Sequence, residues 1–402
     1  MTNRNMYNKS EESDYSKQTV GPRELRTGYT TGSTAAAAAK AAVMRLLSGD
    51  EVPTVLIDLP IGQSAELTIH RYDIIDSEHV LCSVIKDGGD DPDATHGAEI
   101  CVKVSRDHTR SGVTITRGEG VGLVTRPGTG IDVGEPAVTR VPRRMIVESI
   151  QQAAVSQGFD PETGFIVEIS VPGGEEIALK TTNSRLGVLG GISILGSTGV
   201  VQPFSTASWR ASVHLAIDVA ATNGLSHLVL STGTRSEEFS KPLLALPEMA
   251  YIEAGIFSGP ALKRCTMRNV KRATHVGMVG KFSKMAMGYF VTHVAGNRVD
   301  TEFLASLASD CGAAPAVQQE IKEASSARHF QEIAQENDLM NVFPVMCRMV
   351  CEESHKLLGQ QSSDLIVDAM CFDFDGTLLA SASTSSEGIP HLDQKDVSGS
   401  SG

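Results

Sequence analysis

The second half of the chain alternates segments of strand character with segments of helix character, and this alternation restricts the folds open to it. Strands are expected at 227–230, up to Glu253 and at 275–279, and helices at 207–222, 237–246, 257–268 and from Phe282 onward. Strands that alternate with helices form a parallel sheet with helices on its faces. The pattern predicts an α/β Rossmann-like domain over 191–380, completed by C-terminal helices and a hairpin.

The first half has a different pattern, dominated by short runs of β-type residues. They stand at 55–59, 65–69, 80–85, 100–104, 113–116 and 166–171, with one helix expected at 143–157. Another helix opens with five alanines at 35–39, and Thr31 or Ser33 is its expected N-cap. An α+β domain over 21–190 is predicted, since 402 residues are many for one core. Residues 1–20 and 381–402 are expected to be disordered.

Composition excludes several classes of protein. The formal net charge of -13 argues against a nucleic-acid partner, because phosphate binding needs a basic surface. No apolar run approaches the roughly 20 residues that span a membrane, and the N-terminal residues lack an apolar signal segment. A cytoplasmic protein with seven reduced cysteines is expected, with Cys347 and Cys351 in core packing. The oligomeric state stays open, a homo-oligomer included.

The segment 86–97, KDGGDDPDATHG, places four carboxylates and a histidine in one loop. Its spacing is not that of an EF-hand, and we predict no metal site there. Asp90, Asp91, Asp93 and His96 are our candidate catalytic residues, in a loop that faces a sulfonium or orients a basic side chain. A solvated turn capped by aspartate side chains explains the same pattern equally well.

Other features of the first domain suit a flat, anionic ligand. Arginines at 117, 126, 140, 143 and 144 lie between glycine-rich turns, and arginine binds carboxylates well; a solvated basic face is the alternative. The alanine helix has an almost bare surface beside Thr30 and Thr31. The segment 187–199 has five glycines among apolar residues, which indicates a buried, shaped loop. The expected substrate-binding residues are Thr30, Thr31, Arg126, Arg143, Arg144 and, from the second domain, Lys284.

Two loops of the second domain lie between a strand and a helix, where backbone amides can bind an anion. The first contains Ser231 and Gly233, and the strand after it ends at Glu253, where an acidic residue commonly binds ribose hydroxyls. The second contains Gly280 and Lys281 but lacks the spacing of a P-loop. These five residues are the expected cofactor site. An acidic residue at a strand end is often merely exposed, which is the alternative for Glu253.

The segment 373–377, DFDGT, matches a phosphatase pattern in which the first aspartate is the nucleophile. Such a motif must open a complete α/β domain, and only a short tail follows it here. A hairpin with Asp375 and Gly376 at its turn is the preferred interpretation. A phosphohydrolase that uses Asp373 and Asp375 is the least favoured function.

In their order along the chain, these segments resemble the CbiD family, the cobalt-precorrin-5B C(1)-methyltransferases. The matching segments are LRTGYTTG at 25–32, the loop 86–97, GEGVGLVTRPG at 118–128, VGEPA at 133–137, VPRRMI at 141–146, the run 183–203, and GKFSKMAMG at 280–288. Any one of these matches is weak, and the ordered set is specific. The family usually has Gly-Thr-Cys before the alanines, where this chain has Gly32, Ser33 and Thr34.

The resemblance implies a two-domain enzyme that transfers a methyl group from S-adenosylmethionine to carbon 1 of a cobalt-corrinoid, in cobalamin biosynthesis. The cobalt arrives inside the substrate, so no metal site of the protein is required. The first domain is expected to hold mainly the corrinoid, and the second the methyl donor. A non-catalytic corrinoid-binding protein is the alternative function. Since methyl transfer needs no covalent nucleophile, the missing cysteine is not expected to abolish activity.

Overall fold

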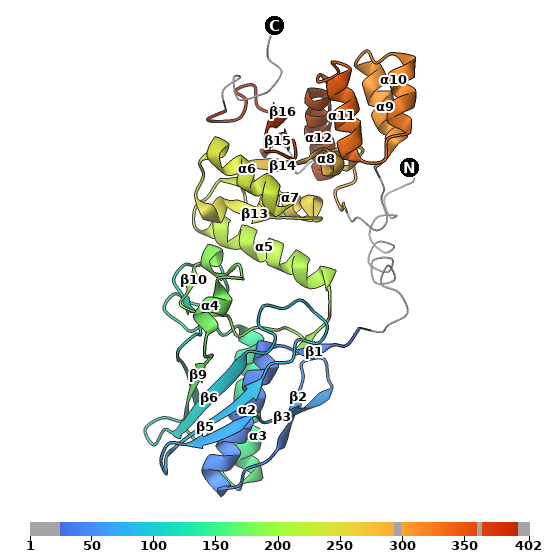
Figure 1. Ribbon diagram of the computed structural model, residues 1–402. Helices are drawn as coiled ribbons and strands as arrows, with labels where there is room; N and C mark the ends of the chain where they lie inside the picture. The colour runs from blue at the N-terminus through green and yellow to red at the C-terminus, as the bar shows by residue number, and fades with distance from the viewer. Residues whose placement is uncertain (1–24, 293–298, 360–363, 393–402) are drawn as a thin grey trace, which may run out of the picture. The chain divides into compact units, whose positions relative to one another are not determined.

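The structure is a computed structural model that describes residues 25–292, 299–359 and 364–392. Two compact units are separated between Ser205 and Thr206 (Figure 1). We call them the N-terminal and C-terminal units. The division lies beyond the expected boundary at 190, because β11 (Val200–Val201) pairs with β1 (Gly28–Tyr29) and ties the intervening segment to the N-terminal unit. The expected disordered lead, 1–20, lies outside the described residues.

The N-terminal unit is built on a five-stranded sheet in the order β4-β5-β6-β9-β7. All neighbours are antiparallel except β7 and β9. The strands are β4 (Arg71–Ile74), β5 (His79–Ile85), β6 (Glu99–Arg106), β7 (Val113–Arg117) and β9 (Phe165–Ser170). A hairpin of β2 (Thr54–Asp58) and β3 (Ser64–Thr68) is added, and β8 (Leu123–Val124) pairs with β10 (Val188–Leu189). The short helices are α4 (Gly174–Ala178) and η1 (Asn183–Leu186).

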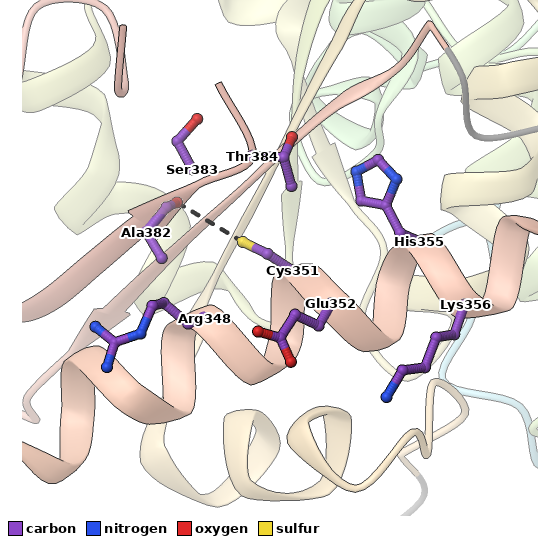
Figure 2. A pocket seen from close by; sticks show the side chains of 8 residues that line it. All are labelled: Arg348, Cys351, Glu352, His355, Lys356, Ala382, Ser383 and Thr384. Atoms are coloured by element: carbon purple, nitrogen blue, oxygen red, sulfur yellow. Dashed lines mark hydrogen bonds between the residues drawn. The ribbon is translucent and has the colours of Figure 1, made fainter. Parts of the chain in front are cut away.

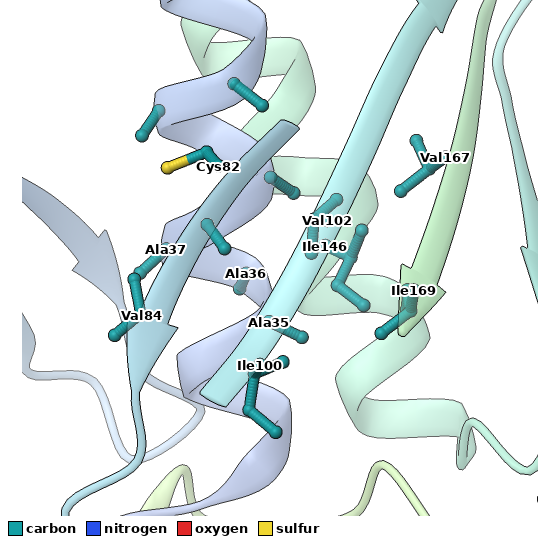
Figure 3. Close-up of a cluster of buried hydrophobic side chains, with 14 of the residues drawn as sticks. Ala35, Ala36, Ala37, Cys82, Val84, Ile100, Val102, Ile146, Val167 and Ile169 are labelled. Atoms are coloured by element: carbon teal, nitrogen blue, oxygen red, sulfur yellow. The ribbon is translucent and has the colours of Figure 1, made fainter. Parts of the chain in front are cut away.

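Two long helices, α2 (Thr31–Ser48) and α3 (Arg140–Ser156), share one hydrophobic core with this sheet. Residues 35–39 of α2 are all alanine and fully buried. Figure 3 shows their methyl groups among Val84, Ile100 and Val102 of β5 and β6, with Ile146 of α3 alongside. Alanine combines the best helix propensity with the smallest side chain, so α2 packs backbone-close to its neighbours.

The N-cap of this helix is neither of the expected residues, Thr31 and Ser33, but the residue before them. Thr30 caps α2, with its Oγ1 accepting a hydrogen bond from the N–H of Ser33. Ser33 and Thr34 are fully buried inside the first turn, and Thr34 donates to the carbonyl of Thr30 at 2.9 Å. Thr34, which stands where the resemblance places a cysteine, is therefore packed within the first turn and bonded to Thr30.

The C-terminal unit has a second five-stranded sheet in the order β13-β12-β14-β15-β16. Its first four strands are parallel, as the alternating pattern predicts, and β16 is antiparallel. The strands are β12 (His227–Ser231), β13 (Tyr251–Glu253), β14 (Arg272–Met278), β15 (Ile366–Phe372) and β16 (Leu378–Ser383). The hairpin of β15 and β16 turns at Gly376, where φ is +98°. Disorder was expected from residue 381, but β16 continues to Ser383 and Ile389 is buried as well.

Helices cover both faces of this sheet. On one face, Leu244 at the end of α6 (Thr234–Leu244) packs on Val229 and Val276. The other face carries α5 (Thr206–Thr222), α7 (Ser258–Met267) and α12 (Val342–Leu358). The remaining helices are η2 (Glu248–Ala250), α8 (Val279–Ala286), α9 (Thr301–Asp310), α10 (Pro315–Lys322) and α11 (Ala327–Glu336). Cys347 and Cys351 of α12 are buried in this core, as expected. No helix among the described residues is long and apolar enough to cross a membrane.

A buried ion pair joins three strands of the C-terminal sheet. Asp368 on β15 has no exposed surface, and Nη1 of Arg272 on β14 lies 3.1 and 3.0 Å from its two carboxylate oxygens. Thr274 donates to the same carboxylate at 2.9 Å and Ser383 of β16 at 2.6 Å. Burial raises the pKa of Asp368. These contacts satisfy a carboxylate that would otherwise be costly to bury.

Candidate functional site

In the N-terminal unit, the acidic loop 86–97 holds the segment that leads into α2. Asp87 forms a two-point ion pair with the guanidinium of Arg26, whose Nη2 lies 3.0 Å from Oδ1. The backbone N–H of Arg26 donates to Oδ2 of Asp90 at 2.8 Å. The hydrogen bond from Arg26 lowers the pKa of Asp87 to about 2. Two of the four carboxylates thus position the chain before α2.

The other two carboxylates of the loop are engaged as well. The side chain of Lys86 is almost fully buried, and its Nζ lies 2.5 Å from Oδ2 of Asp93. Burial raises the pKa of Asp93, but hydrogen bonds from Lys86 and Thr95 outweigh it and lower the pKa below its usual value. Asp91 accepts a hydrogen bond from the N–H of Phe204 at 2.8 Å. These partners favour a loop that orients basic side chains and backbone.

His96 and Asp90 are the candidate catalytic residues with exposed side chains. Nδ1 of His96 accepts a hydrogen bond from the N–H of Gly88 at 3.0 Å, which fixes the orientation of the ring. Among the described residues, no group of three or more His, Cys, Asp and Glu side chains is placed to hold a metal ion.

Glycines allow this loop to touch the chain before α2 through backbone alone. A Cβ added at Gly28 would lie 2.2 Å from the carbonyl carbon of Gly88. A Cβ at Gly89, whose φ is +66°, would lie 2.3 Å from the carbonyl oxygen of Arg26. Neither position has room for a side chain, so the contact depends on glycine on both sides.

The segment 187–199 closes over the N-terminus of α2. Thr31 Oγ1 accepts a hydrogen bond from the N–H of Leu195 at 2.8 Å, and Ser33 donates to the carbonyl of Gly199 at 2.6 Å. The N–H of Gly32 donates to the carbonyl of Leu195 at 3.1 Å. Thr30 and Thr31 are almost fully buried. Their hydroxyls are engaged within the protein: Thr30 caps α2, and Thr31 bonds to the segment 187–199.

The five arginines do not act as one cluster. Arg117 donates from Nε to the carbonyl of Val121 at 2.6 Å and also contacts Gly190, so it supports the glycine-rich segment. Arg126 is exposed and its stem covers Gly187, where an added Cβ would lie 2.6 Å from the Cβ of Arg126. Within the described residues Arg126 forms no ion pair.

Arg140, Arg143 and Arg144 all lie in the first turns of α3. Arg143 is 3.4 Å from Glu135, and Arg144 is 3.8 Å from Glu148, both on the surface. The positive end of the helix dipole disfavours cations, so this placement is electrostatically costly until an anion binds nearby. These three arginines therefore share one helix end, apart from Arg117, which supports the glycine-rich segment.

In the C-terminal unit, the strand order reverses between β12 and β14. From β12 the chain passes through α6 to β13 on one side, and from β14 it passes through α8 to β15 on the other. Ligands of open α/β sheets bind outside the carboxyl ends of the strands at such a reversal. Ser231 is the last residue of β12, Gly233 lies two residues beyond it and Gly280 lies two residues beyond β14, so the structure brings these expected cofactor residues to one edge of the sheet.

The residues at this edge differ in how accessible they are to a ligand. The hydroxyl of Ser231 is buried, 3.2 Å from both the carboxylate of Glu237 and the carbonyl of Ile252, so Ser231 supports the loop from within. At Gly233 an added Cβ would meet only open space. Glu253 is exposed and accepts a hydrogen bond from Thr234 at 3.4 Å.

Thr232 also belongs to this edge, and sequence reasoning missed it. Its Oγ1 would lie 2.6 Å from a Cβ added at Gly277, so the hydroxyl rests against bare backbone of β14. Its N–H donates to the carbonyl of Val276 at 2.9 Å. Its position directly after a buried strand could have identified Thr232, because such a residue lies at the edge of the sheet.

Lys281 lies in the first turn of α8, and Lys284 is almost fully buried in its last turn. Burial lowers the pKa of both lysines, and the charge of Lys284 lowers that of Lys281 further. Of the two, Lys281 is the one at the N-terminus of the helix, where the sequence predicts an anion site.

A separate cavity of about 570 Å³ lies between α12 and the edge strand β16 (Figure 2). Figure 2 shows Arg348, Glu352 and Lys356 projecting from α12, with Ser383 and Thr384 across from them. Cys351 donates weakly to the carbonyl of Ala382 at 3.8 Å. None of the expected site residues lines this cavity, so we do not assign it to the site.

Comparison with known families places matches in both units. A family model described as CbiD matches residues 18–203, and one described as CbiD, C-terminal domain, matches residues 291–383. Among solved structures, the crystal structure of the cobalamin biosynthesis protein (cbiD) from Archaeoglobus fulgidus is 26% identical, with 78% of this chain and 85% of that chain covered and a TM-score of 0.37.

Curated relatives match over nearly the whole chain, and each is named cobalt-precorrin-5B C(1)-methyltransferase. The relative from Geobacillus thermodenitrificans is 44% identical over 90% of this chain and 95% of its own length. The one from Leptospira borgpetersenii is 42% identical over 90% and 96%. The one from Thermus thermophilus is 45% identical over 87% and 92%.

The pair of Lys86 and Asp93 gives a test of how the acidic loop is held. Lys86→Met removes the cation that faces Asp93 where water is largely excluded. Breaking a buried ion pair costs about 3–5 kcal/mol, and we expect the lower end because Asp93 is partly exposed. Urea unfolding followed by circular dichroism measures the loss in free energy of unfolding.

Lys103→Met is the matched control. Lys103 pairs with Glu168 at 2.8 Å on the surface of the same unit, and removing such a pair costs at most about 1 kcal/mol. Adding Asp93→Asn to Lys86→Met should recover part of the loss. Equal losses in the Lys86 and Lys103 variants would contradict a buried, shape-determining pair.

Proposed function

This chain belongs to the CbiD family, and on that premise we propose that it is a cobalt-precorrin-5B C(1)-methyltransferase of cobalamin biosynthesis. The observation that carries the proposal is the match to curated relatives of that name, at 44% identity over 90% of this chain and 95% of the relative. The match covers almost all of both proteins, so it includes both units of this chain. The resemblance inferred from the ordered motifs is confirmed.

The proposed reaction joins a methyl group to carbon 1 of cobalt-precorrin-5B and gives cobalt-precorrin-6A. The ring carbon supplies the electron pair of the new bond, and the bond between sulfur and the methyl carbon breaks in the same in-line displacement. S-adenosylmethionine supplies the methyl group on a sulfonium and leaves as S-adenosylhomocysteine. The protein's contribution is positioning, which can provide roughly 7–11 kcal/mol of rate enhancement.

We assign the methyl donor to the carboxyl edge of the C-terminal sheet, which we interpret as Rossmann-like. The strand order reverses there, and Gly233 leaves the approach to the backbone open. Glu253 is exposed at the end of β13, where it suits a ribose diol. Gly280 and Lys281, at the start of α8, suit the carboxylate of the methionine moiety, and Ser231 holds the facing loop in shape.

We assign the carboxylate arms of the corrinoid to the arginines of the N-terminal unit. Arg126 is exposed beside the glycine-rich segment, and Arg143 and Arg144 stand at the N-terminus of α3. Guanidinium groups bind carboxylates in two-point geometry. For Thr30 and Thr31, buried within the α2 cap, the support is indirect: they shape the surface beside which the ligand lies.

The acidic loop is assigned to orientation of the reacting partners. Asp90 and His96 expose their side chains, where a carboxylate favours a nearby sulfonium. Asp91 and Asp93 fix the loop through Phe204 and Lys86. No step requires a metal held by the protein, since the cobalt enters with the substrate.

The direct test is methyl transfer in vitro. With cobalt-precorrin-5B and S-adenosylmethionine, the product should gain one methyl group by mass spectrometry, and S-adenosylhomocysteine should bind with saturation by calorimetry. Corrinoid binding with neither methyl transfer nor binding of S-adenosylhomocysteine would identify a carrier instead. Asp373→Asn should leave the transfer rate unchanged, because Asp373 lies at the hairpin turn, and that result would dismiss the phosphohydrolase alternative.

Glu253 tests the position of the methyl donor. Glu253→Ala removes the acceptor proposed for the ribose hydroxyls, and a hydrogen bond to a charged group contributes about 1.5–3 kcal/mol. The dissociation constant for S-adenosylhomocysteine should therefore rise roughly ten- to a hundredfold. The control is Glu248→Ala, which removes an exposed carboxylate that pairs with Lys241. Unchanged affinity in the Glu253 variant would reject the ribose assignment.

Arg126 and Arg143 test the position of the corrinoid. Arg126→Ala and Arg143→Ala should each raise the dissociation constant of the corrinoid roughly ten- to a hundredfold, while that of S-adenosylhomocysteine stays nearly constant. Arg110→Ala, in an exposed loop of the same unit, is the control. If both affinities stay unchanged, the arginines only solvate the surface; if the methyl donor is lost instead, the two assignments are reversed.

A further inference from the structure

The single tryptophan of the chain, Trp209, lies at the carboxyl edge of the C-terminal sheet. It belongs to the first turn of α5, and 42% of its surface is exposed. A Cβ added at Gly255 would clash with Cζ2 of Trp209 and lie 2.9 Å from its Cη2, so the indole rests on bare backbone. The N–H of Gly255 donates to the carbonyl of Ser231 at 2.9 Å, which ties this contact to the end of β12.

Gly255 allows the indole to come this close to the sheet. Its φ is +58°, a backbone conformation that favours glycine, and no side chain fits between its backbone and the ring. Phe257 meets the indole in a T-shaped arrangement, with the ring centroids 5.4 Å apart and the planes at 87°. The loop after β13 thus holds the ring of Trp209 and leaves part of its surface open.

The loop that holds the indole begins at Glu253, the residue assigned above to the ribose of the methyl donor. Glu253 and Gly255 are two residues apart, so their Cα atoms lie within about 7 Å of each other. In adenosine the base is bonded directly to the ribose, so a group that contacts the base must lie close to the group that binds the ribose hydroxyls. Trp209 meets that requirement through its contact with Gly255, and all three residues belong to the C-terminal unit.

The open surface of the indole suits a flat, apolar partner. An indole and a purine stack through their π faces, and such stacking strengthens binding without hydrogen bonds to the edge of the base. A lone exposed apolar side chain is common on protein surfaces, but Trp209 differs because Gly255 and Phe257 hold its ring in one orientation. A ring that is already oriented loses little conformational freedom when a base stacks on it.

The order of the assigned contacts along the edge favours the base over the sulfonium as the partner of the indole. The strands lie in the order β13, β12 and β14, with Glu253 at the end of the first and Lys281 beyond the last. Under these assignments the methionine moiety lies toward β14 and the adenosine toward β13. Trp209 contacts the loop after β13, so its ring meets the adenosine end of the ligand.

We propose that the indole of Trp209 stacks on the adenine ring of the methyl donor. The inference rests on the proposed function, because that function supplies a donor built on adenosine. It adds to that function the residue that selects a purine base at the β13 end of the site, and it brings α5 into the binding of the donor.

The test uses S-adenosylhomocysteine and the full-length protein. Because the sequence contains one tryptophan, selective excitation of tryptophan reports on Trp209 alone, and saturating ligand should quench its emission. Trp209→Leu keeps apolar bulk but removes the aromatic face, and it should raise the dissociation constant measured by calorimetry roughly five- to a hundredfold. Trp209→Phe should recover most of the affinity. Met267→Ala, which truncates an exposed apolar side chain at the other end of α7, is the control and should bind as wild type does.

The outcomes separate the stacking from the function. If wild-type protein does not bind S-adenosylhomocysteine, the proposed function fails. If wild-type protein binds it without a change in the emission of Trp209, or if the Leu and Phe variants bind it equally tightly, the stacking alone is overturned. S-adenosylmethionine should lose affinity for Trp209→Leu by the same factor as S-adenosylhomocysteine. A clearly larger loss for S-adenosylmethionine would mean that the indole faces the sulfonium, and it would overturn the assignment to the base.

Discussion

The N-terminal unit depends on how closely other backbone can approach α2. Its buried alanines remove the side chains that would otherwise hold the sheet and α3 away, and each close contact adds dispersion attraction along the helix. The same requirement recurs at the entrance to the helix, where Gly28 meets Gly88 and Gly89 without side chains between them. Carbonyl groups of the segment 187–199 then accept hydrogen bonds from the first turn. The acidic loop and the glycine-rich segment are thereby fixed to one rigid element.

The C-terminal unit separates its stabilising and its ligand-binding ends along the same strands. At its start, β14 carries Arg272, which neutralises the buried Asp368. At its other end it leads into Gly280 and Lys281, where the strand order reverses. The polar groups at the first end are paired with one another, whereas the second end leads into the residues proposed to bind the methyl donor. The proposed site and the buried network therefore lie at opposite ends of the same strand.

Local periodicity allowed most long elements to be predicted, and non-local pairing accounts for what was missed. The helices and strands around Glu253 follow from their own residues, but the strand reversal depends on β12 pairing with β14, whose residues are distant in sequence. The two-residue strands β1 and β11 are too short to show a period, and they decide where the unit ends. Ser-rich composition suggested disorder after Ala380, although β16 is held there by pairing with β15.

The candidate site, too, was predictable from local sequence only in part. The acidic loop was recognised from its composition, but its partners were not, because Arg26 and Phe204 come from opposite ends of the unit. Among Thr30, Thr31 and Ser33, the hydroxyl that caps α2 was not predictable, since the other two are taken by the distant segment 187–199. The residues proposed for the cofactor were selected because they lie at or just beyond the ends of strands. Thr232 has the same position and was overlooked beside Ser231 and Gly233.

The insertion of α8 to α12 between β14 and β15 governs the order in which the C-terminal unit can assemble. The two strands pair in seven register positions, yet the whole segment 279–365 separates them. Helices form from local contacts, whereas such a parallel pairing must first close a long loop, which slows folding. During synthesis β15 emerges only after the whole segment 279–365, so Arg272 stays without Asp368 until that segment has been made. Completion of the sheet therefore comes after the synthesis of α8 to α12.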